Sequence, residues 1–277
     1  MSLMNSFRGA LAASVLVSIA AGAAVAATTE APARSKAAAA KSVKKYPVEQ
    51  FFATTRITGA SFSADEKRIL FSSDATGLFN AYAIAAAGGK PEQLTKSTTD
   101  TTYGVSYFPD DDRILYTRDK GGDENNHLFV RELNGNELDL TPGDKLKAQF
   151  AGWRPDGSAF YVLTNERDPK FFDLYRYDAK SYQRTMLFKN EKGLDVETVS
   201  RDEKWIGLNK TNTTLDTDMY LFDVAKGELK HLTPHTGSVK FAAETFDPAS
   251  KRLFFLTDEG SEFARLKTGL IHRPGLK

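Results

Sequence analysis

The sequence predicts an all-β fold, a β-propeller with four-stranded antiparallel blades. The first observation is a phrase of eleven residues that returns five times, starting at Ser61, Ser106, Gly152, Thr198 and Thr245. Successive starts lie 45, 46, 46 and 47 residues apart, and a fixed period of this size indicates a repeat architecture. The second observation is that no segment after the N-terminus shows the 3.6-residue apolar period of a helix. We therefore expect about five blades of about 46 residues each, the last one incomplete.

The second repeat shows how one blade is built. Four short segments rich in β-branched and aromatic residues are predicted as strands, and they span 102–108, 113–118, 127–132 and 137–141. Pro109 and the aspartates after it form the first turn, because proline fixes φ and aspartate bonds its own backbone. Asn134-Gly135 is a hairpin signal. Four antiparallel strands repeated around an axis make a propeller, whereas a sandwich, the alternative, needs no strict period.

Two kinds of residue recur at fixed places in the repeat. Aromatic residues occupy one equivalent position, and we expect them to pack between blades: Phe62, Tyr107, Trp153 and Phe246. Aspartates occupy the first turn of the repeat at Asp65, Asp110, Asp156 and Asp202. We interpret these aspartates as turn-forming residues, because a propeller places them on separate turns where they cannot converge on a metal.

The N-terminal segment has the pattern of an export signal. A short segment with Arg8 precedes an apolar run at 10–23, and Ala24-Val25-Ala26 fits a signal peptidase site. The alternative, a membrane anchor, is disfavoured because the run is shorter than the roughly 20 residues that span a bilayer. We therefore expect a cleaved signal peptide at 1–26, no stable membrane span, and a periplasmic or secreted protein. The Ala-, Lys- and Ser-rich segment 27–45 is predicted to be a disordered linker.

The composition gives no sign of a nucleic-acid partner, a metal or a cofactor. The net charge is +1, with 37 basic and 36 acidic residues evenly mixed, where a nucleic-acid surface needs a basic patch. The chain has no cysteine, so stability has to come from packing. His231 and His235 are four residues apart, but Pro234 lies between them and rules out the helix on which this spacing would bind a metal.

Three longer segments resemble one family. The segments 57–84, 119–129 and 165–178 are similar to the N-terminal half of exported serine peptidases of the prolyl oligopeptidase family, and the resemblance covers 46–267. It implies a propeller that limits access to short peptides and that is followed by an α/β-hydrolase domain. That domain carries a Gly-x-Ser-x-Gly nucleophile, then Asp and His. The sequence contains no Gly-x-Ser-x-Gly, so no catalytic residue is assigned and we expect the chain to be inactive alone.

The C-terminal segment 268–277 departs from the repeat, and we expect the propeller to span 46–267. We interpret the chain as the product of a truncated or frame-shifted peptidase gene. The alternative is a stand-alone periplasmic propeller of the Tol–Pal type that docks a protein partner. In the first case the partners are peptides, or the hydrolase domain of a full-length relative.

The resemblance also implies a candidate substrate site at Asp123 and Glu124, in a Gly-rich loop of the second repeat. Acidic propeller residues of this family can face the central cavity and hold the amino terminus of a substrate through charge-assisted hydrogen bonds. The alternative is a solvated loop tip.

Overall fold

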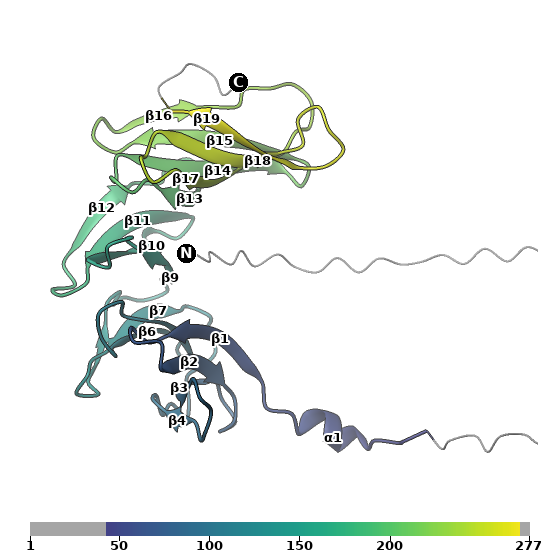
Figure 1. The fold of residues 1–277 in the computed structure, drawn as a ribbon, viewed down its shortest axis with the longest axis vertical. Coiled ribbons are helices and arrows are strands. Elements are labelled where there is room, and N and C mark those ends of the chain that lie inside the picture. Colours follow the sequence, from purple (N-terminus) through teal and green to yellow (C-terminus); the bar gives the residue numbers. More distant parts are fainter. Residues whose placement is uncertain (1–42, 272–277) are drawn as a thin grey trace, which may run out of the picture. The chain divides into compact units, whose positions relative to one another are not determined.

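The structure is a computed structural model that describes residues 43–271 (Figure 1). The expected signal peptide at 1–26 and most of the expected linker lie outside this range. The chain divides into two units, Met1–Phe51 and Phe52–Lys277. The described part of the first unit holds most of a five-residue helix, α1 (Val48–Phe52), which buries no residue. Periodicity did not reveal this helix because it is too short to complete two turns.

The second unit contains five antiparallel sheets that follow one another in chain order, from purple to yellow in Figure 1. The first consists of β1 (Ile57–Phe62), β2 (Arg68–Ser73), β3 (Asn80–Ala85) and β4 (Glu92–Gln93). The second consists of β5 (Thr102–Tyr107), β6 (Ile114–Arg118), β7 (His127–Arg131) and β8 (Glu137–Asp139). The third consists of β9 (Ala148–Trp153), β10 (Ala159–Asp168), β11 (Phe171–Asp178) and β12 (Arg184–Phe188).

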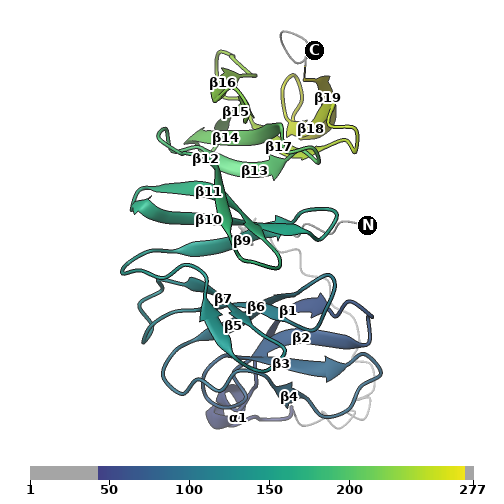
Figure 2. The ribbon, with the colours of Figure 1, turned by 90° about the vertical axis from the view of Figure 1, so that its left-hand side faces the viewer.

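The fourth sheet consists of β13 (Asp195–Val199), β14 (Trp205–Thr213), β15 (Asp216–Asp223) and β16 (Glu228–His231). The fifth has three strands within the described residues, β17 (Phe241–Phe246), β18 (Arg252–Thr257) and β19 (Arg265–Leu270). In every sheet the strands pair in chain order, as Figure 2 shows for β1, β2, β3 and β4. This architecture confirms the predicted propeller blades. β19 extends three residues past Lys267, where the sequence placed the end of the propeller.

The residue pair Leu-Thr recurs near the end of three sheets, and in each of them the threonine has a structural role. Its hydroxyl accepts a hydrogen bond from a backbone N–H of the third strand. The distances are 2.8 Å for Ala81 to Thr95, 2.9 Å for Leu128 to Thr141 and 2.8 Å for Met219 to Thr233. These threonines are buried, so the hydroxyl satisfies an amide that would otherwise lack a partner.

The recurring aspartates lie in the turns between the first and second strands. Asp65, Asp156 and Asp202 each accept the backbone N–H two residues further on, at 3.1, 3.0 and 3.2 Å. The hydrogen bonds from Ser63 and the Lys67 amide lower the pKa of Asp65 to about 2. In the second sheet the acceptor is Asp111, which bonds the Arg113 amide at 3.0 Å, and not the expected Asp110. Three consecutive aspartates made this one-residue shift invisible in the sequence.

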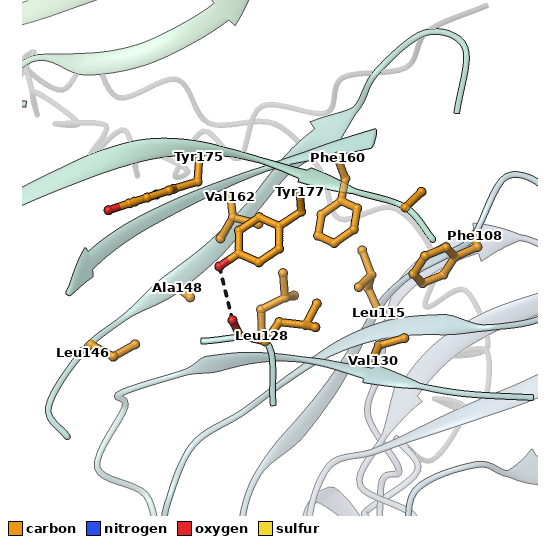
Figure 3. Packing of buried hydrophobic residues seen from close by; sticks show 12 residues of the cluster. Phe108, Leu115, Leu128, Val130, Leu146, Ala148, Phe160, Val162, Tyr175 and Tyr177 are labelled. Atoms are coloured by element: carbon orange, nitrogen blue, oxygen red, sulfur yellow. Dashed lines mark hydrogen bonds between the residues drawn. The ribbon is translucent and has the colours of Figure 1, made fainter. Parts of the chain in front are cut away.

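The hydrophobic core lies between consecutive sheets. Four clusters of buried residues each join a sheet to the next one. The largest joins the second and third sheets, and Figure 3 shows its members Phe108, Leu115, Leu128, Val130, Leu146, Ala148, Phe160, Val162, Tyr175 and Tyr177. The Tyr177 hydroxyl donates a hydrogen bond of 3.2 Å to the Leu140 carbonyl (Figure 3). Each sheet thus buries its faces against its neighbours, as the repeat requires.

The recurring aromatic position packs between sheets wherever a preceding sheet is described. Tyr107 and Phe246 are buried in the clusters that join their sheets to the preceding ones, and Trp153 packs against the cluster of the second and third sheets. Phe62 differs, since 59% of its surface is exposed. In the described part of the chain no sheet precedes the first one, so nothing covers this ring.

No helix within residues 43–271 has the length and apolar character needed to span a bilayer.

Candidate functional site

A cavity of about 710 Å³ opens between the second and third sheets, at the ends where β5 and β9 begin. Its wall on the second sheet comes from β5, the end of β6 and the loop 119–126, and its wall on the third sheet from the start of β9. The lining residues are Thr101, Tyr103, Val105, Thr117, Asp119, Gly122, Glu124, Asn126, Lys147, Ala148, Gln149 and Phe150. This cavity therefore contains Glu124, one of the two residues that the sequence proposed for substrate binding.

Asp119 is a buried carboxylate at the start of the loop. Its Oδ1 accepts the Thr101 amide at 2.8 Å, and its own amide donates to the Thr101 carbonyl at 3.2 Å. The same pair of bonds recurs between Asp74 and Arg56, and between Asp258 and Lys240. Asp119 therefore fixes the start of β5, and it also lines the cavity.

Asp123 shapes the loop and is absent from the cavity lining. Its carboxylate accepts the Lys120 amide at 3.2 Å and the Asn125 amide and side chain at 2.9 and 3.2 Å. The hydrogen bond from the Asn125 amide, followed by those from Lys120 and the Asn125 side chain, lowers the pKa of Asp123. The carboxylate is thus held ionised as the centre of a tight turn.

Glu124 is the next residue of the loop, and its environment differs from that of Asp123. Its backbone has φ of 59°, a left-handed conformation that non-glycine residues adopt rarely and often at functional sites. Glu124 is exposed and lines the cavity. The structure thus separates the two predicted residues, since Asp123 supports the loop whereas Glu124 lines the cavity.

Lys147 supplies the positive charge of the opposite wall. Its amide donates to Asn165 Oδ1 at 2.6 Å, and its carbonyl accepts the Asn165 amide at 3.2 Å. The next residue, Ala148, donates its amide to the Asn126 carbonyl at 2.7 Å, which ties the loop to β9. Lys147 was not predicted from the sequence, because it lies between two repeat phrases. The recurrence of Asp or Asn at 74, 119, 165 and 258 was the signal that could have marked the start of the first strand in four of the five sheets.

Aromatic and aliphatic side chains complete the lining. The Tyr103 ring lies 5.0 Å from that of Phe79, centroid to centroid, while Val105 and Phe150 pack against the core of the second and third sheets. The lining residues include two acidic residues and one lysine, and no histidine, cysteine or serine is among them.

Each of the three histidines within residues 43–271 pairs with a carboxylate. His127 Nδ1 lies 2.7 Å from Asp139 Oδ2, His231 Nε2 lies 2.8 Å from Asp218 Oδ1, and His235 Nε2 lies 2.8 Å from Asp216 Oδ1. No group of three or more histidine, aspartate or glutamate side chains within residues 43–271 has a geometry that could hold a metal ion.

No protein-family model matches the sequence. A search of curated proteins finds a dipeptidyl aminopeptidase BIII from Pseudoxanthomonas mexicana, which is 35% identical over 150 residues. The match covers 52% of this chain and 21% of that protein. The chain therefore spans about a fifth of the length of this relative.

Solved structures with a similar fold include prolyl peptidases. A prolyl endopeptidase studied for its inter-domain dynamics matches with a TM-score of 0.59 and 17% identity, over 81% of this chain and 36% of that one. Prolyl oligopeptidase B from Galerina marginata matches with a TM-score of 0.54 and 14% identity, over 78% and 32%. TolB from Acinetobacter baumannii matches over 78% of this chain and 52% of TolB, at 21% identity, with a TM-score of 0.46 that is too low to carry an argument. With a dipeptidyl aminopeptidase as a sequence relative and prolyl oligopeptidases as structural neighbours, the chain has the β-propeller found in peptidases of the prolyl oligopeptidase family.

Proposed function

We propose that this chain is the non-catalytic propeller portion of a prolyl oligopeptidase-like serine peptidase that acts on short peptides. The observation that carries the proposal is the 35% identity to a dipeptidyl aminopeptidase over 150 residues, a length equal to about three of the repeats. In this role the propeller admits short peptides and excludes folded proteins. The signal-like segment 1–26 supports export to the periplasm or the medium.

Glu124 is the residue that we assign to substrate recognition. An ionised carboxylate in the cavity accepts charge-assisted hydrogen bonds from the ammonium group of a peptide, which are about twice as strong as neutral ones. Asp123 contributes indirectly, because the turn that it organises presents Glu124. The loop therefore favours substrates with a free amino terminus.

Hydrolysis by a serine peptidase requires a nucleophile motif that is absent from this sequence. A serine peptidase needs a nucleophilic serine, a histidine base and an oxyanion hole, and the nucleophile motif Gly-x-Ser-x-Gly is absent from the printed sequence. We therefore propose that the catalytic serine belongs to a hydrolase domain outside residues 1–277.

A fluorophosphonate probe, which labels activated serines, tests this function. The tagged chain is incubated with an envelope extract of the cells that make it, recovered, and treated with the probe. We expect the chain itself to stay unlabelled and a labelled hydrolase to be recovered with it. Label on the chain would contradict a non-catalytic role. Recovery of an envelope protein without an active serine would instead favour the stand-alone propeller of the Tol–Pal type.

A further inference from the structure

We propose that two copies of this chain associate head to tail, with the fifth sheet of one copy stacked on the first sheet of the other. The proposal rests on two uncovered apolar surfaces, one on the first sheet and one on the fifth. The counterparts of both surfaces are buried elsewhere in the same chain. This inference concerns assembly, so it is independent of the proposed peptidase role.

Consecutive sheets of the chain pack by one rule. Each sheet has a leading face, which carries the recurring aromatic position and packs against the preceding sheet, and a trailing face, which packs against the following one. The leading-face residues Tyr107 and Ile114 of the second sheet thus form one cluster with the trailing-face residues Leu70 and Ala81 of the first. The other three clusters repeat this arrangement, so every interface between sheets joins one trailing face to one leading face.

The leading face of the first sheet is uncovered. Phe62 pairs with Ile69 across β1 and β2, and Ile69 pairs with Ile84 across β2 and β3. The three side chains form a row on one face, because directly opposite residues of paired strands point to the same side of a sheet. The counterparts of the first two, Tyr107 and Ile114, expose 3% and 1% of their surface. Phe62 is 59% exposed, and Ile69 and Ile84 are partly exposed.

The trailing face of the fifth sheet is uncovered as well. Leu266 pairs with Leu256 across β18 and β19, and Phe254 lies two residues from Leu256 on the same face. Leu266 is 64% exposed and Phe254 is partly exposed. The residues at the place of Leu266 in the other four sheets are all fully buried: Ala81, Leu128, Leu174 and Met219. The fifth sheet therefore carries an apolar residue where the fold elsewhere places the centre of an interface.

The two uncovered faces are complementary in the same way as neighbouring sheets. Ala81 and Tyr107 belong to one cluster, and Met219 and Phe246 belong to another. A trailing face that carries Leu266 therefore fits a leading face that carries an aromatic ring at the position of Phe62. Within residues 43–271 no sheet precedes the first or follows the fifth, and both surfaces remain exposed in one copy. A second copy supplies the missing face to each of them.

The contact joins two unlike surfaces, and this determines how association proceeds. A pair of chains leaves one free leading face and one free trailing face, so further copies add until a ring closes or a filament grows. A two-fold dimer formed through either face alone would instead stop at two copies. Blocking one face in one set of chains and the other face in a second set therefore distinguishes the two arrangements.

Sedimentation velocity of the purified chain over a range of concentrations tests the proposal. We expect the parent chain to form dimers and larger species as its concentration rises. Phe62→Asp blocks the leading face and Leu266→Asp the trailing face. Each variant alone should be monomeric, with its self-affinity reduced about 100-fold, because association would bury an unpaired carboxylate. An equimolar mixture of the two variants should form dimers and nothing larger, since each supplies the face that the other lacks.

Leu133→Asp is the matched control and should associate like the parent chain. Leu133 is 66% exposed but lies in the hairpin between β7 and β8 of the second sheet, outside both uncovered faces. Circular dichroism should show the parent spectrum for every variant, because all three side chains are exposed.

Phe62→Ser and Leu266→Ser, which add no charge, should give the same pattern as the aspartate pair, and they decide the test if an aspartate variant loses its fold. A parent chain that stays monomeric would overturn the proposal. So would a folded variant that dimerises by itself like the parent, or a mixture of the two folded variants that remains monomeric.

Discussion

The Tyr182 hydroxyl of the third sheet donates a hydrogen bond of 2.5 Å to the Glu132 carboxylate of the second sheet. The same hydroxyl accepts a bond of 2.6 Å from Arg113 Nη1, whose guanidinium carbon lies 4.1 Å from the centroid of the Phe108 ring. These contacts lie at the edge of the hydrophobic core between the second and third sheets, the two sheets that also line the cavity. Burial, together with the bond to Glu132, raises the pKa of Tyr182 to about 12.

Tyr182→Phe should therefore destabilise the chain by about 1–3 kcal/mol, because it leaves a carboxylate and a guanidinium without their shared partner. Urea unfolding followed by tryptophan fluorescence measures the change. Tyr46→Phe, at a half-exposed ring in the first unit, is the control and should change the free energy of unfolding by less than about 0.5 kcal/mol. Equal midpoints for the two variants would show that the contact contributes nothing.

Phe160→Ala should cost about 3–5 kcal/mol. The ring is fully buried in the core between the second and third sheets, where Figure 3 shows it with Phe108 and Tyr177. It also contacts Trp153. Phe263→Ala removes a ring that is 73% exposed, and it should be nearly neutral. A comparable loss of melting temperature in both variants would contradict the core as described.

Thr141→Val should cost about 1–3 kcal/mol although it preserves shape. The substitution removes the hydroxyl that accepts the buried Leu128 amide at 2.9 Å and leaves that amide without a partner. Hydrogen exchange at Leu128 should accelerate more than exchange at Leu115, which lies in the adjacent strand. An unchanged exchange rate at Leu128 would mean that the recurring threonine is not needed.

The stability of the fourth sheet should fall as the pH rises through the pKa of His235. The pKa of His235 is raised above its usual value, chiefly by its hydrogen bond to the Thr233 carbonyl and then by its bond to Asp216, which outweigh partial desolvation. A raised folded pKa means that the contribution is complete below the unfolded pKa of about 6.5 and is lost above the folded one.

Urea titrations at pH 6 and pH 9 measure this difference. His235→Asn should reduce the decrease in stability between the two pH values. His127→Asn, in a different sheet, should leave the part due to His235 in place. An identical pH dependence in the parent chain and in His235→Asn would contradict the assignment.

The blades could be predicted from the sequence because equivalent residues in each repeat pack against the neighbouring sheets. The period reflects the packing of consecutive sheets against one another, and the Leu-Thr pair reflects a hydrogen bond within a sheet. Phe62 could not be distinguished from Tyr107 in this way, since its exposure depends on a neighbour and not on the repeat itself.

The candidate site was predicted only in part. Glu124 was found through its loop, but the role of Asp123 depends on backbone amides that a sequence does not show. Lys147 lies 23 residues further along the chain and lines the same cavity as Glu124 because the second and third sheets stack. Such a pair has no local sequence pattern, and the geometry between sheets is needed to reveal it.

Equilibrium dialysis of the purified chain against the tripeptide Ala-Phe-Ala, followed by mass spectrometry of both compartments, tests most directly whether this propeller binds short peptides without cleaving them. The account predicts that the peptide accumulates, intact, on the side that contains the protein. Equal peptide concentrations in the two compartments, or the appearance of Ala-Phe and free alanine, would contradict it.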